Sequence, residues 1–250
     1  MKHFKLRTDL TIEVGGKTLY RIEATKDIEK FGVKAGDLGG YIEKEDNLSG
    51  NAWVSGDARV YGNAWVSGDA LVCDNAWVSG DAFVYGNALV SGDALVCGNA
   101  RVYGDALVSG NARVYGDAWV YGNARVYGKA RVCCNAWIYG NAEVYGEAEV
   151  YGKAMVYGKA RVCGNAEVYG DKIEKENDLI NITSNSGSYN ITITPKHIKI
   201  GCQYHSKTAW FNFTENEIVK MDGEKAVEWW RTWKPILKQI CDSFASNKEE

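Results

Sequence analysis

The sequence predicts an all-β chain that coils around an axis and ends in a small module of strands and helices. A six-residue pattern repeats from Leu48 to Val168 and places Gly with Asn or Asp between short apolar segments. The pattern ends at residue 171, where the composition changes. Because 46% of the 250 residues are hydrophobic and the net charge is only -3, the chain can bury a core.

Each repeat has the form Val-x-Gly-(Asn/Asp)-Ala-x, and twenty-one hexapeptides follow one another without an insertion. The aliphatic residue is Val except at Leu48 and Ile138, while Asp74 and Cys134 replace the Gly. Val is β-branched and favours strands, and the Ala two residues before it points to the same side, so both are expected to face inward. Gly and the following Asn or Asp adopt positive φ most easily, which predicts a corner after every short strand.

This pattern resembles that of the hexapeptide-repeat proteins, whose units combine an aliphatic residue, two or three turn residues and a small residue. The resemblance implies a left-handed parallel β-helix with three strands and eighteen residues per coil, so the repeats would form about seven triangular coils. The segment ATKDIEKFGVKAGDLGGYIEKEDNLS, residues 24–49, resembles the entry segment of YdcK-type bacterial hexapeptide proteins and of phage or prophage proteins with the same repeats. This likeness covers about residues 15–170.

We expect three parts in the chain. Residues 1–47 alternate in polarity and turn at Gly15-Gly16, which predicts a β-hairpin that caps the first coil. Residues 48–171 form the β-helix, and residues 172–250 form a C-terminal α+β module. A cap is needed because the end of a β-helix exposes unpaired strand edges, which would allow end-to-end growth.

The module is expected to contain strands first and helices afterwards. Residues 179–203 and the following TAWFNF, residues 208–213, predict three or four antiparallel strands. The sequence TENE, residues 214–217, resembles a capping box that opens a short helix. A longer helix is expected after Asp222, and Pro235 predicts a kink or the start of a second helix.

Stacking residues eighteen apart sorts the outward positions into three ladders, which begin at Trp53, Arg59 and Trp65. The ladder from Trp65 is almost entirely aromatic. Since monomers rarely expose so large an apolar surface, we expect it to mediate self-association or the docking of terminal segments. The alternatives are stacking of the rings between coils and a ring platform that binds a ligand. The candidate interface residues are Trp65, Phe83, Tyr85, Tyr103, Trp119, Tyr121, Trp137, Tyr139 and Tyr157.

Three tryptophans near the C-terminus, Trp229, Trp230 and Trp233, form the densest aromatic cluster in the chain. Trp is enriched at binding hot spots, so these residues are candidates for contact with a partner. Packing in the core of the module is nevertheless the default expectation, and contact of one of these rings with a target is the functional alternative. The module itself is expected either to pack on the end of the β-helix or to associate with its copies.

The resemblance also raises an enzymatic hypothesis, since many left-handed β-helices are acyl-coenzyme A dependent acyltransferases with a histidine as general base. Such a base titrates near neutral pH. The chain has only His3, His197 and His205, so the repeat itself lacks a histidine and the last two would have to reach over from the module. We therefore predict no catalytic residue and no cofactor, with an acyltransferase as the alternative.

Metal ions, nucleic acids and membranes are not expected as partners. Asn or Lys can take the position of each corner Asp, so turn chemistry explains these residues better than cation binding. Arg125, Glu143 and Arg161 share one ladder and can pair with one another, which leaves little charge for phosphates. Seven cysteines without paired spacing, and no targeting or membrane segment, predict a protein with reduced thiols in the cytoplasm of a bacterial host cell.

Together these observations predict a non-enzymatic, self-associating binding protein, homo-oligomeric through the aromatic ladder or the module. The likeness to phage proteins implies inhibition or sequestration of a host component, such as a defence factor. The partner would then be a host protein or a small signal molecule. A structural or virion-assembly role is a further alternative.

Overall fold

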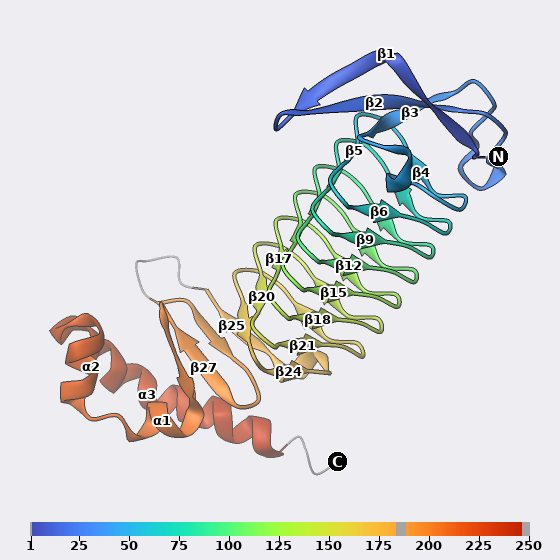
Figure 1. The fold of residues 1–250 in the computed structure, drawn as a ribbon. Coiled ribbons are helices and arrows are strands. Elements are labelled where there is room, and N and C mark those ends of the chain that lie inside the picture. The colour runs from blue at the N-terminus through green and yellow to red at the C-terminus, as the bar shows by residue number, and fades with distance from the viewer. Residues whose placement is uncertain (1, 184–188, 247–250) are drawn as a thin grey trace.

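A computed structural model describes residues 2–183 and 189–246 of the chain. Stacked coils form a long prism, with a hairpin at its N-terminal end and a module of strands and helices at the other end (Figure 1). The prism has three sides, each of which is a parallel sheet of very short strands.

The three sheets are called the first, second and third face. The first face consists of β6 (Trp65–Val66), β9 (Phe83–Val84), β12 (Arg101–Val102), β15 (Trp119–Val120), β18 (Trp137–Ile138), β21 (Met155–Val156) and β24 (Lys172–Ile173). The second consists of β4 (Trp53–Val54), β7 (Leu71–Val72), β10 (Leu89–Val90), β13 (Leu107–Val108), β16 (Arg125–Val126), β19 (Glu143–Val144) and β22 (Arg161–Val162). The third contains β5 (Arg59–Val60), β8 (Trp77–Val78), β11 (Leu95–Val96), β14 (Arg113–Val114), β17 (Arg131–Val132), β20 (Glu149–Tyr151) and β23 (Glu167–Tyr169).

Neighbouring coils pair in parallel with a register of eighteen residues, as in the pairing of Trp119 with Trp137. Backbone N–H groups of one coil donate to carbonyl groups of the next, and Trp119 N lies 2.9 Å from Ala136 O. At β24 the register shortens by one residue, since Met155 pairs with Lys172. The repeat is therefore a parallel β-solenoid of about seven coils, which confirms the predicted coil and its spacing.

The core of the prism consists of the Val and Ala residues of the repeat, which are all at most 1% exposed. It forms one continuous cluster from Phe4 in the hairpin to Ile173 in the last coil. The prediction that both positions face inward is confirmed.

Trp53 was predicted to lie on an outer ladder, but only 2% of it is exposed. The reason is that the N-terminal segment covers the first coil. A Cβ on Gly39 would lie 2.8 Å from the Trp53 ring, and the His3 ring centroid is 6.3 Å from that of Trp53. A side chain that points out of the coil is thus buried by the cap.

The corners turn at the Gly position of each repeat, where φ is positive, as at Gly104 with +73°. A Cβ on Gly86 would lie only 3.0 Å from the backbone nitrogen of Gly104 in the next coil, so a side chain there is crowded as well as strained. Asp74 and Cys134 replace Gly and keep φ values of 61° and 60°. The Asn or Asp that follows does not share the positive φ, so the prediction holds for Gly and is wrong for its neighbour.

Asn and Asp side chains form hydrogen-bonded ladders along the corners. Asn63 Nδ2 donates to Asp81 Oδ1 at 3.0 Å, and Asn99 Nδ2 donates to Asp117 Oδ1 at 2.9 Å. Asn and Asp alternate along much of the repeat, and the number of hexapeptides per coil is odd. They therefore also alternate up each corner, where an amide separates each carboxylate from the next.

The N-terminal cap is the predicted hairpin followed by one further strand. β1 (Phe4–Val14) and β2 (Lys17–Ala24) pair in antiparallel fashion around Gly15-Gly16. β2 also pairs with β3 (Leu38–Ile42), and β3 pairs in parallel with β5, so the cap continues the third face. The 3₁₀ turns η1 (Glu29–Phe31) and η2 (Glu45–Asn47) flank β3.

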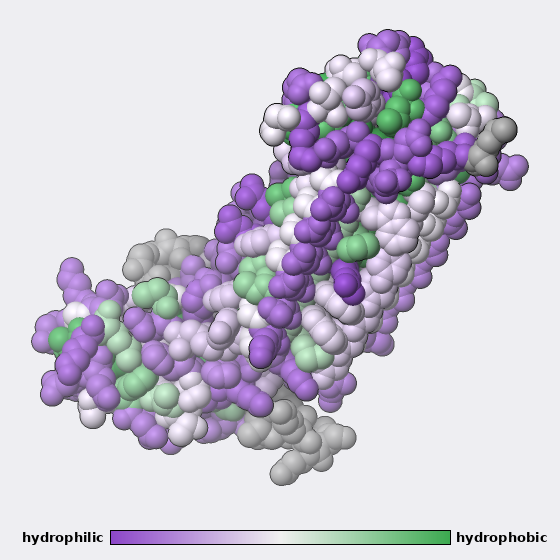
Figure 2. All heavy atoms as spheres, viewed as in Figure 1, coloured by the Kyte–Doolittle hydropathy of each residue, from purple (hydrophilic) through white to green (hydrophobic). Residues whose placement is uncertain are grey.

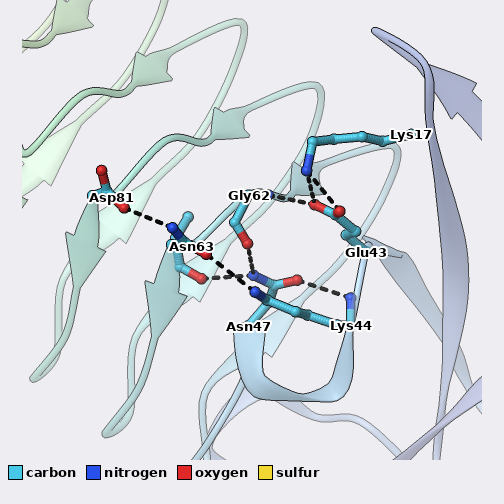
Figure 3. A network of polar contacts seen from close by, with 8 residues as sticks. Lys17, Glu43, Lys44, Asn47, Gly62, Asn63 and Asp81 are labelled. Atoms are coloured by element: carbon cyan, nitrogen blue, oxygen red, sulfur yellow. Dashed lines mark hydrogen bonds and ion pairs between the residues drawn. The ribbon is translucent and has the colours of Figure 1, made fainter.

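Polar contacts join the cap to the first coils (Figure 3). The Glu43 carboxylate accepts hydrogen bonds from Lys17 Nζ at 2.7 Å and from the Gly62 N–H at 2.6 Å. The buried amide of Asn47 donates to the carbonyls of Gly62 and Ala64 at 3.2 and 2.7 Å. These side chains satisfy backbone groups at an end of the prism where no further coil could do so.

The module begins with an antiparallel sheet in the order β25 (Ile180–Ile182), β26 (Ile191–Ile193), β27 (His197–Ile200) and β28 (Gln203–Ser206). The turn η3 (Glu176–Asp178) connects it to β24. The antiparallel strands agree with the prediction for residues 179–203, of which residues 184–188 lie outside the described residues.

Three helices follow the sheet: α1 (Lys207–Asn212), α2 (Glu215–Asp222) and α3 (Glu224–Ser246). The strand predicted for residues 208–213 is wrong, because Ser206 Oγ accepts from the Ala209 N–H at 3.1 Å and caps a helix there. The capping box at Thr214 is confirmed. The second helix predicted at Pro235 is also wrong, since α3 continues through that residue and packs Trp230 and Leu237 into one core.

Candidate interaction surfaces

Five tyrosines stack in one continuous column along the first face. Neighbouring ring centroids lie 4.8–5.0 Å apart, and the ring planes differ by only 1–6°. This separation follows the spacing of adjacent strands. The inner rings are covered on both sides by the rings of the coils before and after. The column consists of Tyr85, Tyr103, Tyr121, Tyr139 and Tyr157.

A second, mixed column runs beside the tyrosines. The rings of Trp119 and Trp137 are stacked at 5.3 Å. The Arg101 guanidinium lies 4.8 Å from the Trp119 ring centroid and 5.7 Å from that of Phe83. Trp65 packs edge-on against Phe83 at 5.9 Å. All nine candidate interface residues therefore lie together on the first face, and the structure also contains the stacking between coils that was the alternative interpretation.

Stacking leaves ring edges and hydroxyl groups at the surface of the first face. Trp65 and Trp137 are 39% and 38% exposed, whereas the other candidates are half-buried. Figure 2 shows the face as a pale strip beside a strongly hydrophilic ridge. Since neighbouring rings cover both sides of the inner tyrosines, these rings are poorly placed to stack on a base or a sugar. A flat protein surface is a better match for ring edges.

The first face also carries little charge. Burial raises the pKa of Tyr103, Tyr121 and Tyr139 above the usual value, so their hydroxyls are neutral at physiological pH. Arg101 is the one cation in these two columns between Trp65 and Tyr157, and it lies over aromatic rings. Covering the face therefore desolvates few charged groups.

The other two faces differ because their later coils carry paired charges. Arg161 Nε lies 3.5 Å from Glu143 on the second face, and Arg131 Nη1 lies 3.1 Å from Glu149 on the third. The pairing predicted between Glu143 and Arg161 is therefore confirmed. Such surfaces lose more hydration on association than an aromatic face does.

The three candidate tryptophans of the module have different environments. Trp230 is 3% exposed and belongs to the core, as the default expectation of core packing predicted. Trp229 and Trp233 are half-buried, and their rings stack at 5.4 Å. Trp229 also meets the Tyr189 ring edge-on at 4.9 Å. The cluster thus joins the core of the module to its surface.

A buried carboxylate at the joint between prism and module was not identified from the sequence. Asp171 is 3% exposed and accepts hydrogen bonds from His197 Nδ1 at 2.8 Å, from Tyr204 Oη at 3.1 Å and from the Thr194 hydroxyl. Burial and the Asp171 carboxylate raise the pKa of Tyr204. Asp171 follows a Gly as the corner residues of the repeat do, so only its position at the end of the pattern could have marked it.

The three histidines are held by different neighbours. His197 donates to the Asp171 carboxylate through Nδ1 and stacks on Tyr204 at 4.8 Å. His205 packs edge-on against aromatic rings, and burial lowers its pKa. His3 belongs to the cap, where its Nε2 lies 2.8 Å from Ala52 O. Of these, His197 alone has a carboxylate that could orient it as a base.

Several cavities lie at the C-terminal end of the molecule, and two of them bear on ligand binding. A polar cleft of about 890 Å³ between the last coil and the module is bordered by Lys172, Lys175 and Lys196. A small apolar pocket lies within the module. In residues 2–183 and 189–246, no three His, Cys, Asp or Glu side chains gather as metal ligands. No helix in the same part of the chain is long and apolar enough to cross a membrane.

The stacked parallel sheets and their corner ladders define this chain as a β-solenoid protein. Its coils match the family model of the YdcK β-solenoid repeat at residues 52–68, 82–98, 94–109, 106–122 and 118–133. Within residues 52–133 the chain therefore resembles YdcK-type β-solenoid repeats. The matched segments lie within the prism and include neither the cap nor the module. The search of curated proteins found no match.

Proposed function

We propose that this chain is a non-enzymatic binding protein that self-associates through its first face and holds a partner with its C-terminal module. The observation that carries the proposal is the alignment of nine aromatic side chains along one face, with Trp65 and Trp137 more than a third exposed. Contiguous surfaces of this kind mark association sites in soluble proteins. Aromatic residues are also enriched at the centres of such sites.

A second copy of the chain is the occupant that best fits the first face. The rings recur along the face with a regular spacing, and ring edges of one copy can meet rings or hydroxyls of another. A two-fold arrangement would pair the same columns from both copies. Arg101 is drawn over rings within its own chain, so few charges would be buried unpaired.

The finer part of the proposal concerns the partner of the module. We propose a component of a bacterial host, a protein or a small signal molecule, whose action the chain blocks by binding. This part rests on the resemblance of residues 24–49 to phage and prophage proteins.

Replacing Tyr121 and Trp137 together with Lys tests self-association. The added charges would face each other between copies, so the mass from light scattering is expected to fall from a multiple of 27.6 kDa to that value. The matched control replaces Leu89 and Leu107 on the second face with Lys, and its mass should equal that of the wild type. A wild-type protein of 27.6 kDa would refute the proposal, as would equal dissociation of the control.

An acyltransferase is the second candidate, because Asp171 holds the His197 ring in a fixed orientation at 2.8 Å. Acetyl transfer from acetyl-coenzyme A to small amines would be measured with the wild type and with His197→Ala. The main proposal expects no transfer by either protein. If the wild type transferred the acetyl group and His197→Ala did not, the chain would be an enzyme.

A further inference from the structure

The apolar pocket in the C-terminal module is lined mainly by aromatic side chains. Tyr189, Trp210, Trp229 and Trp230 contribute four of its walls. Its volume of about 40 Å³ exceeds the roughly 10–15 Å³ that one water needs in such a cavity. The pocket therefore has room for more than one water-sized group but does not enclose a large ligand.

The rings that line the pocket are inclined to one another. Tyr189 and Trp229 meet at 83°, and Trp210 and Trp230 at 41°. Trp210 and Trp230 are each 3% exposed, and Trp210 Nε1 donates to Ile198 O at 2.7 Å. Core packing and this hydrogen bond fix two of the four rings before any ligand binds.

Among the residues that the structure describes, Asp222 is the one charged side chain that lines the pocket. Its Oδ2 accepts a hydrogen bond from the Tyr189 hydroxyl, which raises the pKa of Tyr189 to about 12. The tyrosine therefore stays neutral beside the carboxylate of Asp222, which lines the same pocket. Lys234 lies over the Trp230 ring at 5.6 Å but is not part of the lining.

We propose that this pocket binds a methylated ammonium group, such as a trimethylated amine. The faces of aromatic rings carry negative potential and attract cations, and methyl groups remove most of the hydration that a bare ammonium would have to give up. Asp222 adds an opposite charge, which an anionic or neutral group could not use. The inference names the chemistry recognised by the module and so rests on the partner-binding part of the proposed function.

Calorimetry on the full chain, with choline and its neutral carbon isostere dimethylbutanol, tests the preference for a cation. The two probes have the same shape, so an apolar pocket would bind them equally. Choline is expected to bind in the millimolar range and about tenfold more tightly than the isostere. Equal binding of both probes, or binding of neither, would refute the inference.

Two variants locate the site. Asp222→Asn should weaken choline binding about five- to tenfold and leave the isostere unaffected, since only the charge is removed. Glu224→Gln removes a neighbouring carboxylate outside the pocket and should bind choline like the wild type. Indole signals in the nuclear magnetic resonance spectrum would verify the fold of both variants. Undiminished choline binding by Asp222→Asn would refute the site, whereas light scattering tests self-association separately.

Discussion

At the scale of single residues, the repeat pattern predicts nearly every inward side chain and every corner. The periodic positions are predictable because one residue type recurs wherever the geometry recurs. Trp53 and Asp171 escaped prediction, because their burial comes from segments that are distant in sequence. The local sequence does not distinguish Trp53 from Trp65, yet the cap covers Trp53 and leaves Trp65 39% exposed.

The corner at Cys134 provides a test of residue-scale strain. Its φ of 60° disfavours any side chain, so Cys134→Gly should relieve backbone strain. Gly also has a larger entropy in the unfolded chain, which offsets part of this gain. We therefore expect the free energy of unfolding to rise by a net amount of about 0.5–1 kcal/mol. Urea denaturation would measure this. Asp74→Gly is the comparison: Asp74 Oδ2 accepts from the Gly92 N–H at 2.9 Å, so a smaller gain is expected there. A lower stability of Cys134→Gly would contradict the strain argument.

At the scale of elements, strands defined by the repeat were predictable, whereas elements of the module were less so. TAWFNF has the β-branched and aromatic content of a strand, but Ser206 caps it as α1. At the solenoid corners, the local sequence pattern is correct, but its structural meaning depends on the coil. Their Asn and Asp alternate in sequence, and the alternation becomes a ladder of amides and carboxylates only once the coil contains three units.

Asn99→Asp tests the ladder. It would place three consecutive carboxylates, at Asp81, position 99 and Asp117, along one corner. We expect a loss of about 0.5–1 kcal/mol that shrinks at high salt, because exposed like charges repel and are screened. Thermal unfolding at low and high salt would measure it. Asn141→Asp is the control, since its neighbours along the corner are Asn123 and Lys159. Equal losses in both variants, without salt dependence, would refute the role of charge alternation.

At the scale of the whole molecule, the prism and the module are joined through buried polar contacts. Asp171 accepts from His197, Tyr204 and Thr194, and the Tyr204 hydroxyl also donates to Tyr169 O at 2.5 Å. The sequence predicts both parts and their order. It does not predict this joint, because the module residues that meet Asp171 follow it by 23 to 33 positions and belong to no repeat.

Asp171→Ala should loosen the module without unfolding the prism. Three donors would lose a buried acceptor, which costs about 2–3 kcal/mol locally. Hydrogen exchange is expected to accelerate in β26, β27 and β28 and to stay slow in the coils around Val102. Asp171→Asn, which retains an acceptor oxygen, should have a smaller effect. Uniform acceleration throughout the chain would show that prism and module unfold as one unit.

The odd number of units per coil also constrains how a gene for such a chain can lengthen. Duplication of one coil keeps each face aligned, but it stacks Asp on Asp and Asn on Asn at the new seam. Duplication of two hexapeptides preserves the alternation of Asn and Asp, but it moves the aromatic hexapeptides that follow the insertion to another side of the prism. Both requirements are met together when two whole coils are copied. Lengthening by pairs of coils is therefore the route that preserves both the corner ladders and the aromatic face.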